Sequence, residues 1–446
     1  MFIINLLNYM DRYTITGLLP DIKGYYNIDD EKSGLLQTSF ILSYMVCCVL
    51  FGYLGDRINR KLIIMCGVTF WSLITLASSF IPKDMFWLFV VMRSLLGVGE
   101  ASYSTVAPAI ISDLFTKEWR TKLMAFFSFA IPIGSGLGFI IGFALKTWFG
   151  VWQAALRFTP IIGVVCLFML FFIVNEPVRG SADGIKKSIP TSWIEDIKQL
   201  LINPSFMFIT LGFTVVCFVL GSLSWFAVIY MGYAEKAYNQ YLDNSSSMNI
   251  NYIFGSMTVL AGLFGVVIGA EAGRRLRRIF PYADPLVCAF GLILGAPCFL
   301  LSMVLAKYHF NWSLVVIFIA QTLLCFNWAL VTDMTMSVVN PWRRASAAAF
   351  QMIVGHALGD AGSPYYVGII KSSLNDKFRI SASSADSNYY SMQYAMLINA
   401  PILVIGGFFF IFASFYITND KFKVSENVIK YSKSNMSNED ARILTM

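Results

Sequence analysis

The sequence predicts an all-α integral membrane protein whose twelve transmembrane helices form two pseudo-symmetric six-helix bundles. Its 446 residues are 57% hydrophobic and only 13% charged, whereas soluble domains carry about 25% charged residues. Apolar runs of about 20 residues, the length that spans a bilayer, recur along the whole chain. These runs are too long and alternate too little for barrel strands, so we expect the spans to be helices.

Twelve apolar segments follow one another along the chain. The longest polar interruption comes after the sixth segment and divides the array into two halves of six, an internal repetition that many membrane folds share. Similarity between the halves is weak, although a loop rich in glycine and charge follows the second segment of each half. The segments are 1–20, 33–55, 62–81, 86–111, 123–145, 157–174, 206–231, 251–270, 284–305, 312–337, 346–369 and 391–417.

These segments divide the chain into four regions. We expect an N-terminal bundle over 1–174, a cytosolic interdomain loop over 175–205, a C-terminal bundle over 206–417 and a cytosolic tail over 418–446. The tail is polar and rich in Lys, Ser and Asn, which predicts disorder. Because Met1 falls inside an apolar run, either the start is truncated or the first helix begins at the very end of the chain.

The distribution of basic residues predicts the orientation. Most of the 33 Lys and Arg residues lie in the loops after the second, fourth, sixth, eighth and tenth segments and in the C-terminal tail. Basic loops stay on the cytosolic side of a membrane. Both termini are therefore expected to be cytosolic.

Composition and motifs exclude several function classes. The net charge of +7 is explained by basic cytosolic loops, and no hydrophilic domain is present to bind nucleic acid. All eight cysteines lie in apolar stretches without a C-x-x-C pair, so we expect packing residues and neither a disulfide framework nor a metal site. Neither H-E-x-x-H nor G-x-S-x-G occurs, and we predict no enzyme activity and no cofactor.

Ionisable residues inside the predicted membrane segments are the main candidates for a functional site. Each costs about 2.5–3.5 kcal/mol to insert, so such residues mark either a pathway or a buried pair. Charges near the midplane occur in both halves, and three or four of them exceed what one structural pair needs. The candidates are Asp11, Arg12, Arg93, Glu100, Asp333, His356 and Asp360.

Helical geometry suggests which of these charges meet. With a rise of 1.5 Å per residue, Arg93 lies about 10 Å and Glu100 about 21 Å deep on one face of the fourth helix. If the first helix ends near Pro20, Asp11 lies about 13 Å deep, between the two. Arg93 is then a natural counter-ion for Asp11 or for an anionic substrate. The alternative is a permanent salt bridge that only holds the two helices together.

His356 and Asp360 lie four residues apart and hence on one helix face. Because histidine titrates near neutral pH, this pair is able to carry or sense a proton. The alternative is a buried neutral histidine that is hydrogen-bonded to Asp360 and has no further role.

The loop Gly52-Tyr53-Leu54-Gly55-Asp56-Arg57-Ile58-Asn59-Arg60-Lys61 resembles the signature loop of the major facilitator superfamily, G-x-L-[AG]-D-R-x-x-R-[KR], at every defined position. Arg93-Ser94-Leu95-Leu96-Gly97-Val98-Gly99 resembles the fourth-helix motif of the same superfamily, R-x-x-x-G-x-G. The first resemblance implies a cytosolic gate, in which we also expect Arg57 to pair with Asp113. The expected gate residues are Gly52, Gly55, Asp56, Arg57, Arg60 and Asp113.

A narrower resemblance is to the Spinster family of lysolipid transporters and covers about residues 5–417. The segments that carry it are Asn8–Arg12, Leu18–Ile22, Gly97–Ser104, Ile131–Gly138, Asn327–Ala329, Arg343-Arg344 and His356–Tyr365. The resemblance implies transport of lysophospholipids or sphingosine 1-phosphate, with proton coupling in the lysosomal branch. Carried over by motif, Asp11, Arg12, Arg93, Glu100 and His356 would line the polar part of the cavity. Our own hypothesis is that Arg12, Arg93, Glu100, Asn327 and His356 bind the substrate and that Asp11, Glu100, His356 and Asp360 couple protons.

Together these observations predict a secondary active lysolipid transporter that works by alternating access. The expected partners are the lysolipid, protons and the lipid bilayer. A carrier of another small organic anion or of a sugar is the alternative. The resemblance and a loose acidic dileucine pattern, Glu439–Leu444, favour a late endosomal or lysosomal membrane, with the plasma membrane as the alternative. The sequence does not determine the oligomeric state, and a monomer is the expectation.

Overall fold

The computed structural model describes residues 1–55, 58–115, 117–173, 193–242, 249–340, 343–378 and 384–443. Their regular structure is helical throughout, as the sequence predicted. Within these ranges, nine helices are long and apolar enough to cross a membrane. The other three predicted spans depart from that pattern for separate reasons. The first is divided into two helices, the fourth carries Arg93 and Glu100, and the eleventh is interrupted.

The first half of the chain forms one helical bundle. In it α1 packs on α6 and α7, while α3 and α4 both pack on α5. Its helices are α1 (Phe2–Gly17), α2 (Leu19–Tyr26), α3 (Asp30–Gly55), α4 (Arg60–Ser78), α5 (Phe86–Leu114), α6 (Lys117–Phe149) and α7 (Gln153–Ile173).

The second half forms another bundle, in which α9 and α11 pack on α17 and α12 packs on α10 and α11. The tenth, eleventh and twelfth predicted spans each consist of consecutive helices. The elements are α8 (Trp193–Ile202), α9 (Pro204–Leu242), α10 (Ile250–Leu276), α11 (Ala283–Leu305), α12 (Phe310–Cys325), α13 (Asn327–Val338), α14 (Arg344–Gly355), η2 (His356–Asp360), α15 (Ser363–Phe378), α16 (Ser384–Met396) and α17 (Asn399–Ile443).

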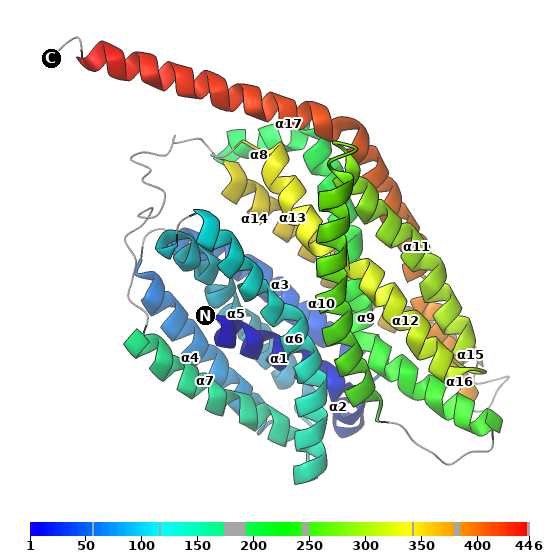
Figure 1. Cartoon of the computed structure of the whole chain (residues 1–446). Helices are drawn as coiled ribbons and strands as arrows, with labels where there is room; N and C mark the ends of the chain where they lie inside the picture. The colour runs from blue at the N-terminus through cyan, green and yellow to red at the C-terminus, as the bar shows by residue number, and fades with distance from the viewer. Residues whose placement is uncertain are drawn as a thin grey trace.

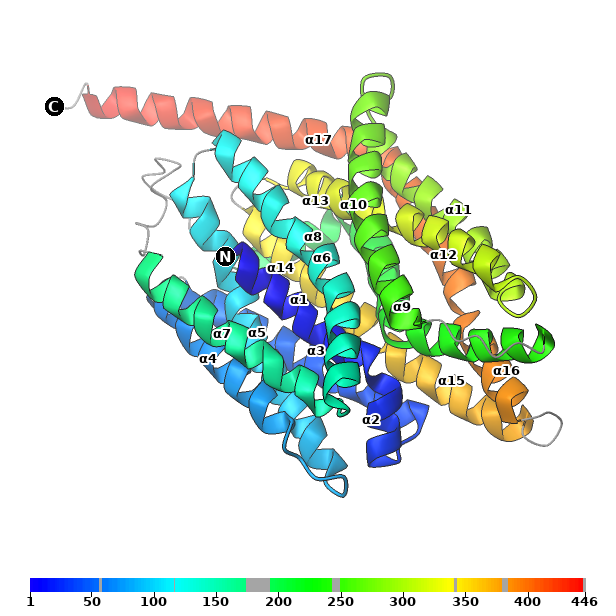
Figure 2. The same cartoon turned by 60° about the horizontal axis from the view of Figure 1, so that its bottom comes forward.

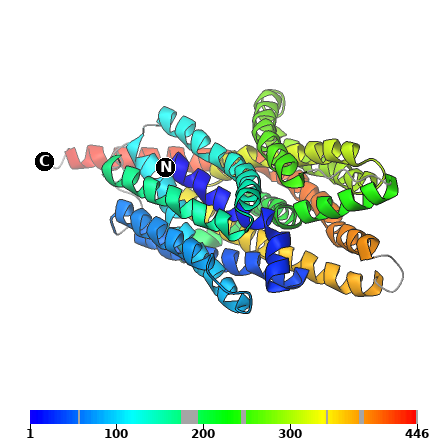
Figure 3. The same ribbon diagram turned by 90° about the horizontal axis from the view of Figure 1, so that it is seen from below.

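The two bundles lie side by side, the first in blue to teal and the second in green to red (Figures 1 and 2). The view from below shows the same arrangement (Figure 3). Two helix pairs make the main contact between the bundles, α6 with α10 and α3 with α15. Smaller contacts between the bundles join α3 to η2 and α1 to α9.

The first span is longer than predicted and is bent. We expected it to end near Pro20, but the helix is only interrupted at Leu18 and resumes as α2, with Pro20 in its first turn. Proline is tolerated there because the first turn needs no donor from that N–H group. The span ends at Asn27, whose φ of 50° and ψ of 50° are left-handed, a common helix terminator.

The end of the chain also differs from expectation, because α17 continues to Ile443 through most of the region 418–446 that we predicted to be disordered. The first residues of this region are anchored in the second bundle. The carboxylate of Asp420 accepts hydrogen bonds from the Ser205 hydroxyl at 2.6 Å and from the Ser205 amide at 3.3 Å. In Figure 1, α17 then extends away from the bundles.

Candidate functional site

Asp11 is buried inside the first bundle, and its carboxylate accepts three hydrogen bonds. The residue is 1% exposed. The carboxylate accepts bonds from Trp71 Nε1 at 2.6 Å, from Thr75 Oγ1 at 3.0 Å and from Thr159 Oγ1 at 2.9 Å. Asp11 therefore faces α4 and α7. Nothing in the sequence signalled these three donors directly, because buried threonines and tryptophans occur in most membrane helices.

The next residue, Arg12, points to a different side of α1 and pairs with Glu100 of α5. Its Nε lies 2.6 Å from Glu100 Oε2, and the two side chains are 11% and 0% exposed. The guanidinium also lies over the rings of Phe40 and Tyr44, with centroid distances of 4.9 and 4.6 Å. Cation–π contacts of this kind are strongest where water is excluded. They hold Arg12 beside the aromatic face of α3.

Arg93 does not pair with Asp11 in the structure. Its guanidinium lies 5.0 Å from the centroid of the Phe40 ring, the same ring that contacts Arg12. The Nε and Nη2 atoms of Arg93 are buried without a hydrogen-bond partner. The physical reason is the direction of the Asp11 side chain: its carboxylate faces α4 and α7, where Trp71, Thr75 and Thr159 already donate to it.

The second bundle contributes His356 and Asp360. The ring Nδ1 of His356 lies 2.9 and 3.0 Å from the two carboxylate oxygens of Asp360, which confirms the predicted common face. The pair occupies η2, a π-helical turn in which the Ala361 amide donates to the His356 carbonyl at 3.0 Å. Single π-helical turns inside α-helices are frequent at functional sites.

The two halves of the site meet at Tyr44 and His356. Their rings pack edge to face with a centroid distance of 6.0 Å, and the same Tyr44 ring covers Arg12. The side chains of His356 and Asp360 are 19% and 18% exposed. The structure thus brings Arg12, Glu100, His356 and Asp360 together where the bundles touch, with partial access to solvent.

Two further predicted residues lie elsewhere. Asn327 is fully buried at the junction of α12 and α13, where its Nδ2 donates to the Leu324 carbonyl at 3.0 Å and its Oδ1 has no partner. None of these contacts joins it to the Arg12 cluster. Asp333 is not a midplane charge, because its side chain is 55% exposed and pairs with Arg277 at 2.7 Å.

The predicted gate loop is described only in part. Arg60 Nε donates to the Gly55 carbonyl at 2.9 Å, which places a cation at the C-terminal end of α3, where the helix dipole favours it. A Cβ on Gly55 would lie 3.2 Å from Val106 of α5, whereas Gly52 faces open space. Asp56 and Arg57 lie outside the described residues, as does the side chain of Asp113.

The second bundle has a corresponding ion cluster that sequence reasoning did not identify. Arg277, after α10, lies 2.9 Å from Asp284 and 2.7 Å from Asp333, and Lys421 of α17 lies 3.6 Å from Asp284. The run of arginines at 274–278 signalled a loop but not which carboxylates the loop would bind. The cluster joins α10, α11, α13 and α17 at one end of the bundle.

Comparisons with known proteins agree with this architecture. Residues 1–364 match the family model described as Major Facilitator Superfamily. The chain is 18% identical in sequence to a bacterial homolog of the human lysosomal transporter Spinster, solved in an inward-facing and unoccupied conformation, with a TM-score of 0.80 over 94% of this chain and 96% of that one. The nucleoside transporter NupG matches with a TM-score of 0.65 at 13% identity, over 93% and 98% of the two chains.

Relatives in sequence identify the family within this superfamily. Protein spinster homolog 1 of Xenopus laevis is 46% identical over 432 residues, 95% of this chain and 81% of the relative. Its Homo sapiens counterpart is 46% identical over 425 residues, 94% and 80% of the two chains. The sphingosine-1-phosphate transporter SPNS2 of Danio rerio is 43% identical over 429 residues, 95% and 84% of the two chains. This chain is therefore a multi-pass membrane transporter that belongs to the Spinster family of the major facilitator superfamily.

Proposed function

We propose that this protein is a secondary active transporter of lysolipids that couples substrate movement to protons by alternating access. The observation that carries the proposal is the charge cluster where the bundles meet, with the buried pair Arg12 and Glu100 on one side and the partly buried pair His356 and Asp360 on the other. One relative is named for transport of sphingosine 1-phosphate, a single-chain anionic lipid. A charged centre between apolar helices suits a molecule with one charged headgroup and one hydrocarbon chain.

Arg93 is the side chain that we assign to the headgroup phosphate. It is 3% exposed, and its Nε and Nη2 have no hydrogen-bond partner. Guanidinium groups bind phosphate through two parallel N–H donors, and a phosphate would satisfy the two donors that the protein leaves unpaired. Arg12 is already held by Glu100, so we assign it a supporting role, with His356 as the contact from the second bundle. Substrate binding by Asn327 stays a prediction, because its contacts do not join it to this cluster.

Protons are assigned to the carboxylates and the histidine of the same cluster. Glu100 holds Arg12 with Oε2 and leaves Oε1 buried without a partner. Protonation of Glu100 would weaken its hold on Arg12 and free that guanidinium for an anion. Asp11 is the second candidate in the first bundle, and the His356–Asp360 pair is the candidate in the second.

The remaining assignments follow the superfamily pattern. We propose that the bundles, residues 1–174 and 206–417, rock as units about the central cluster. The loop with Gly52, Gly55, Asp56, Arg57 and Arg60, together with Asp113, would close the cytosolic side. Because the basic loops favour that side, both termini would be cytosolic. We propose a late endosomal or lysosomal membrane, with the plasma membrane as the alternative, and a monomer.

Reconstituted vesicles provide the test of the substrate class. The purified full-length chain is expected to take up labelled lysophosphatidylcholine or sphingosine 1-phosphate, and unlabelled lysolipid but not glucose should compete. Arg93→Ala should abolish uptake, whereas Glu271→Gln, at a half-buried side chain of α10 away from the cluster, should leave it unchanged. Uptake of glucose or of a small organic anion without lysolipid uptake would support the alternative carrier and refute this proposal.

A further inference from the structure

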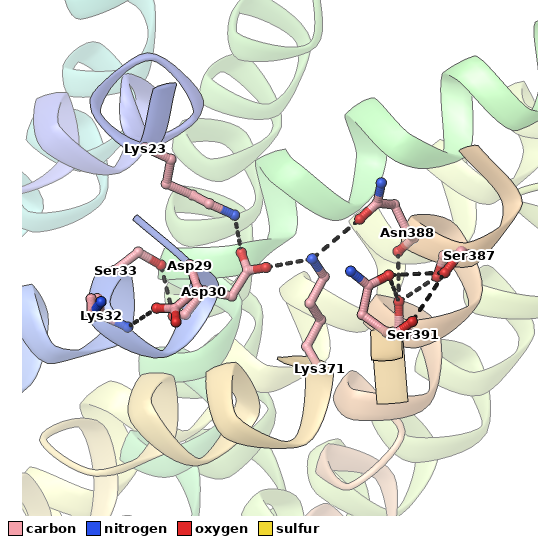
Figure 4. A network of polar contacts seen from close by, with 10 residues as sticks. Lys23, Asp29, Asp30, Lys32, Ser33, Lys371, Ser387, Asn388 and Ser391 are labelled. Atoms are coloured by element: carbon pink, nitrogen blue, oxygen red, sulfur yellow. Dashed lines mark hydrogen bonds and ion pairs between the residues drawn. The ribbon is translucent and has the colours of Figure 1, made fainter. Parts of the chain in front are cut away.

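Three charged side chains form a buried cluster at the end of the molecule that holds α2 and α15, well away from the central site. Asp30, the first residue of α3, pairs through Oδ1 with Lys23 of α2 and through Oδ2 with Lys371 of α15. The side chains of Lys23, Asp30 and Lys371 are 15%, 4% and 5% exposed. Figure 4 shows the Asp30 carboxylate between the two ammonium groups.

The pairing crosses the boundary between the bundles. Lys23 and Asp30 belong to the first bundle, and Lys371 belongs to the second, where it also reaches Asn388 Oδ1 at 3.3 Å. If the bundles part at this end, Lys23 and Asp30 stay together. Lys371 alone then loses its carboxylate, so this contact reports whether this end of the molecule is closed.

Backbone contacts close tightly around the cluster. A Cβ on Gly368 of α15 would lie 2.5 Å from the Asp30 carbonyl, and a Cβ on Gly34 of α3 would lie 2.7 Å from the Pro364 carbonyl. The Tyr365 hydroxyl donates to Glu31 Oε1 at 3.1 Å. The helices therefore touch through their backbones, and the charges have little access to water.

The cluster is the outer end of a continuous contact that runs to the central site. We call this contact between α3 and the segment η2–α15 the seam. From the cluster inward, Gly34 meets Pro364, the Thr38 hydroxyl donates to the Ala361 carbonyl at 2.5 Å, and Tyr44 packs on His356. Opening this end requires the seam to separate from the cluster inward.

The cluster holds two positive charges and one negative charge. Two buried cations share one carboxylate, so the closed form depends on Asp30 far more than on either lysine. Without the carboxylate, two ammonium groups would lie close together away from water, where like charges and desolvation both disfavour the arrangement. Loss of one lysine instead leaves a neutral ion pair.

We propose that Asp30 is the shared anion of an ionic lock, formed with Lys23 and Lys371, that keeps this end of the transporter closed and must break for substrate to pass. With the orientation proposed above, this end is the luminal or extracellular one. The lock depends on alternating access but not on the identity of the substrate. Its test therefore measures conformation, and its failure is distinguishable from a failure of lysolipid transport.

Spin labels on the two bundles measure the opening directly. Lys83, in the loop between α4 and α5, and Ser373 of α15 are both exposed. Tyr25 of α2 reaches the Ile81 carbonyl at 3.5 Å, so the loop lies at the locked end. Cysteines at positions 83 and 373, in a chain whose eight native cysteines are replaced, allow a pulsed electron resonance measurement of the distance distribution.

The lock predicts a specific pattern among the variants. Asp30→Asn should raise the ratio of open to closed populations at least about tenfold, because it strands two buried cations. Lys23→Gln and the exposed Lys32→Gln should leave the distribution unchanged, since the pair between Asp30 and Lys371 persists. Adding Lys371→Gln to Asp30→Asn should reverse part of this opening by removing the repulsion, but not all of it, because no ion pair then joins the bundles. A partial reversal also shows that the opening in Asp30→Asn does not come from misfolding.

Two results would overturn the lock. One is an unchanged distribution in Asp30→Asn. The other is an opening in Lys23→Gln as large as that in Asp30→Asn, because this would mean that the cluster stabilises the end of α2 and not the contact between the bundles.

Discussion

The closeness of the seam can be tested by adding a single methyl group. Gly34→Ala places a Cβ 2.7 Å from the Pro364 carbonyl oxygen and 2.9 Å from the Pro364 carbonyl carbon and the Tyr365 Cα. All three atoms are backbone, so no change of rotamer relieves the overlap. Alanine otherwise favours a helix over glycine by about 1 kcal/mol. The substitution therefore has opposite effects in the closed form and in any form where the seam is apart.

The expected magnitude follows from overpacking, which costs about 1–3 kcal/mol in a tightly packed interior. A penalty of that size, acting only on the closed form, raises the ratio of open to closed molecules by about 5- to 150-fold. The label pair at Lys83 and Ser373 provides the measurement. Gly232→Ala is the matched control, because Gly232 lies inside α9 and a Cβ there would meet no other atom within 4 Å.

The outcome of this comparison is decisive for the seam. Gly34→Ala should lengthen the distance distribution, and Gly232→Ala should leave it as in the parent chain. If Gly34→Ala instead behaves like Gly232→Ala, or raises the melting temperature without opening, α3 and α15 are not in backbone contact and the reasoning is refuted.

Other predictions concern single contacts. Arg93→Lys should retain part of the lysolipid uptake that Arg93→Ala loses, because lysine keeps the charge without the paired donors; equal uptake in the two variants would contradict phosphate binding there. Asp284→Asn should lower the free energy of unfolding by about 1–3 kcal/mol, because it removes the carboxylate that Arg277 and Lys421 share. Thermal unfolding checks this, with Glu271→Gln as the control variant. Thr38→Val should open the seam less than Gly34→Ala does, because it removes a hydrogen bond without creating an overlap, and the same distance measurement checks this.

Sequence reasoning predicted the helices well because each span is a continuous apolar run that ends at glycine, proline or a charged residue. It also placed His356 and Asp360 on one face, since their spacing alone determines this. Partners in separate helices were harder to predict. The pairing of Arg93 with Asp11 was wrong because a depth estimate does not give the direction of a side chain, and the Asp11 carboxylate faces α4 and α7.

The lock was missed for a different reason. Lys23 and Asp30 lie between the first two predicted segments, where charges are ordinary, and Lys371 falls just past the eleventh segment. Nothing local in the sequence indicates that these ends are buried. Only the packing of α3 against α15, two helices more than 300 residues apart in the sequence, removes the three charged side chains from water.

The most direct test of proton-coupled lysolipid transport is a measurement of proton movement during lysolipid flux. Vesicles that contain the full-length chain and an internal pH dye, without an imposed pH gradient, receive lysolipid on one side. We expect an internal pH change that follows lysolipid flux, and loss of that change in Glu100→Gln or Asp11→Asn while lysolipid still exchanges across the membrane. Lysolipid flux without a pH change in the parent chain, or an unaltered pH change in both variants, would contradict it.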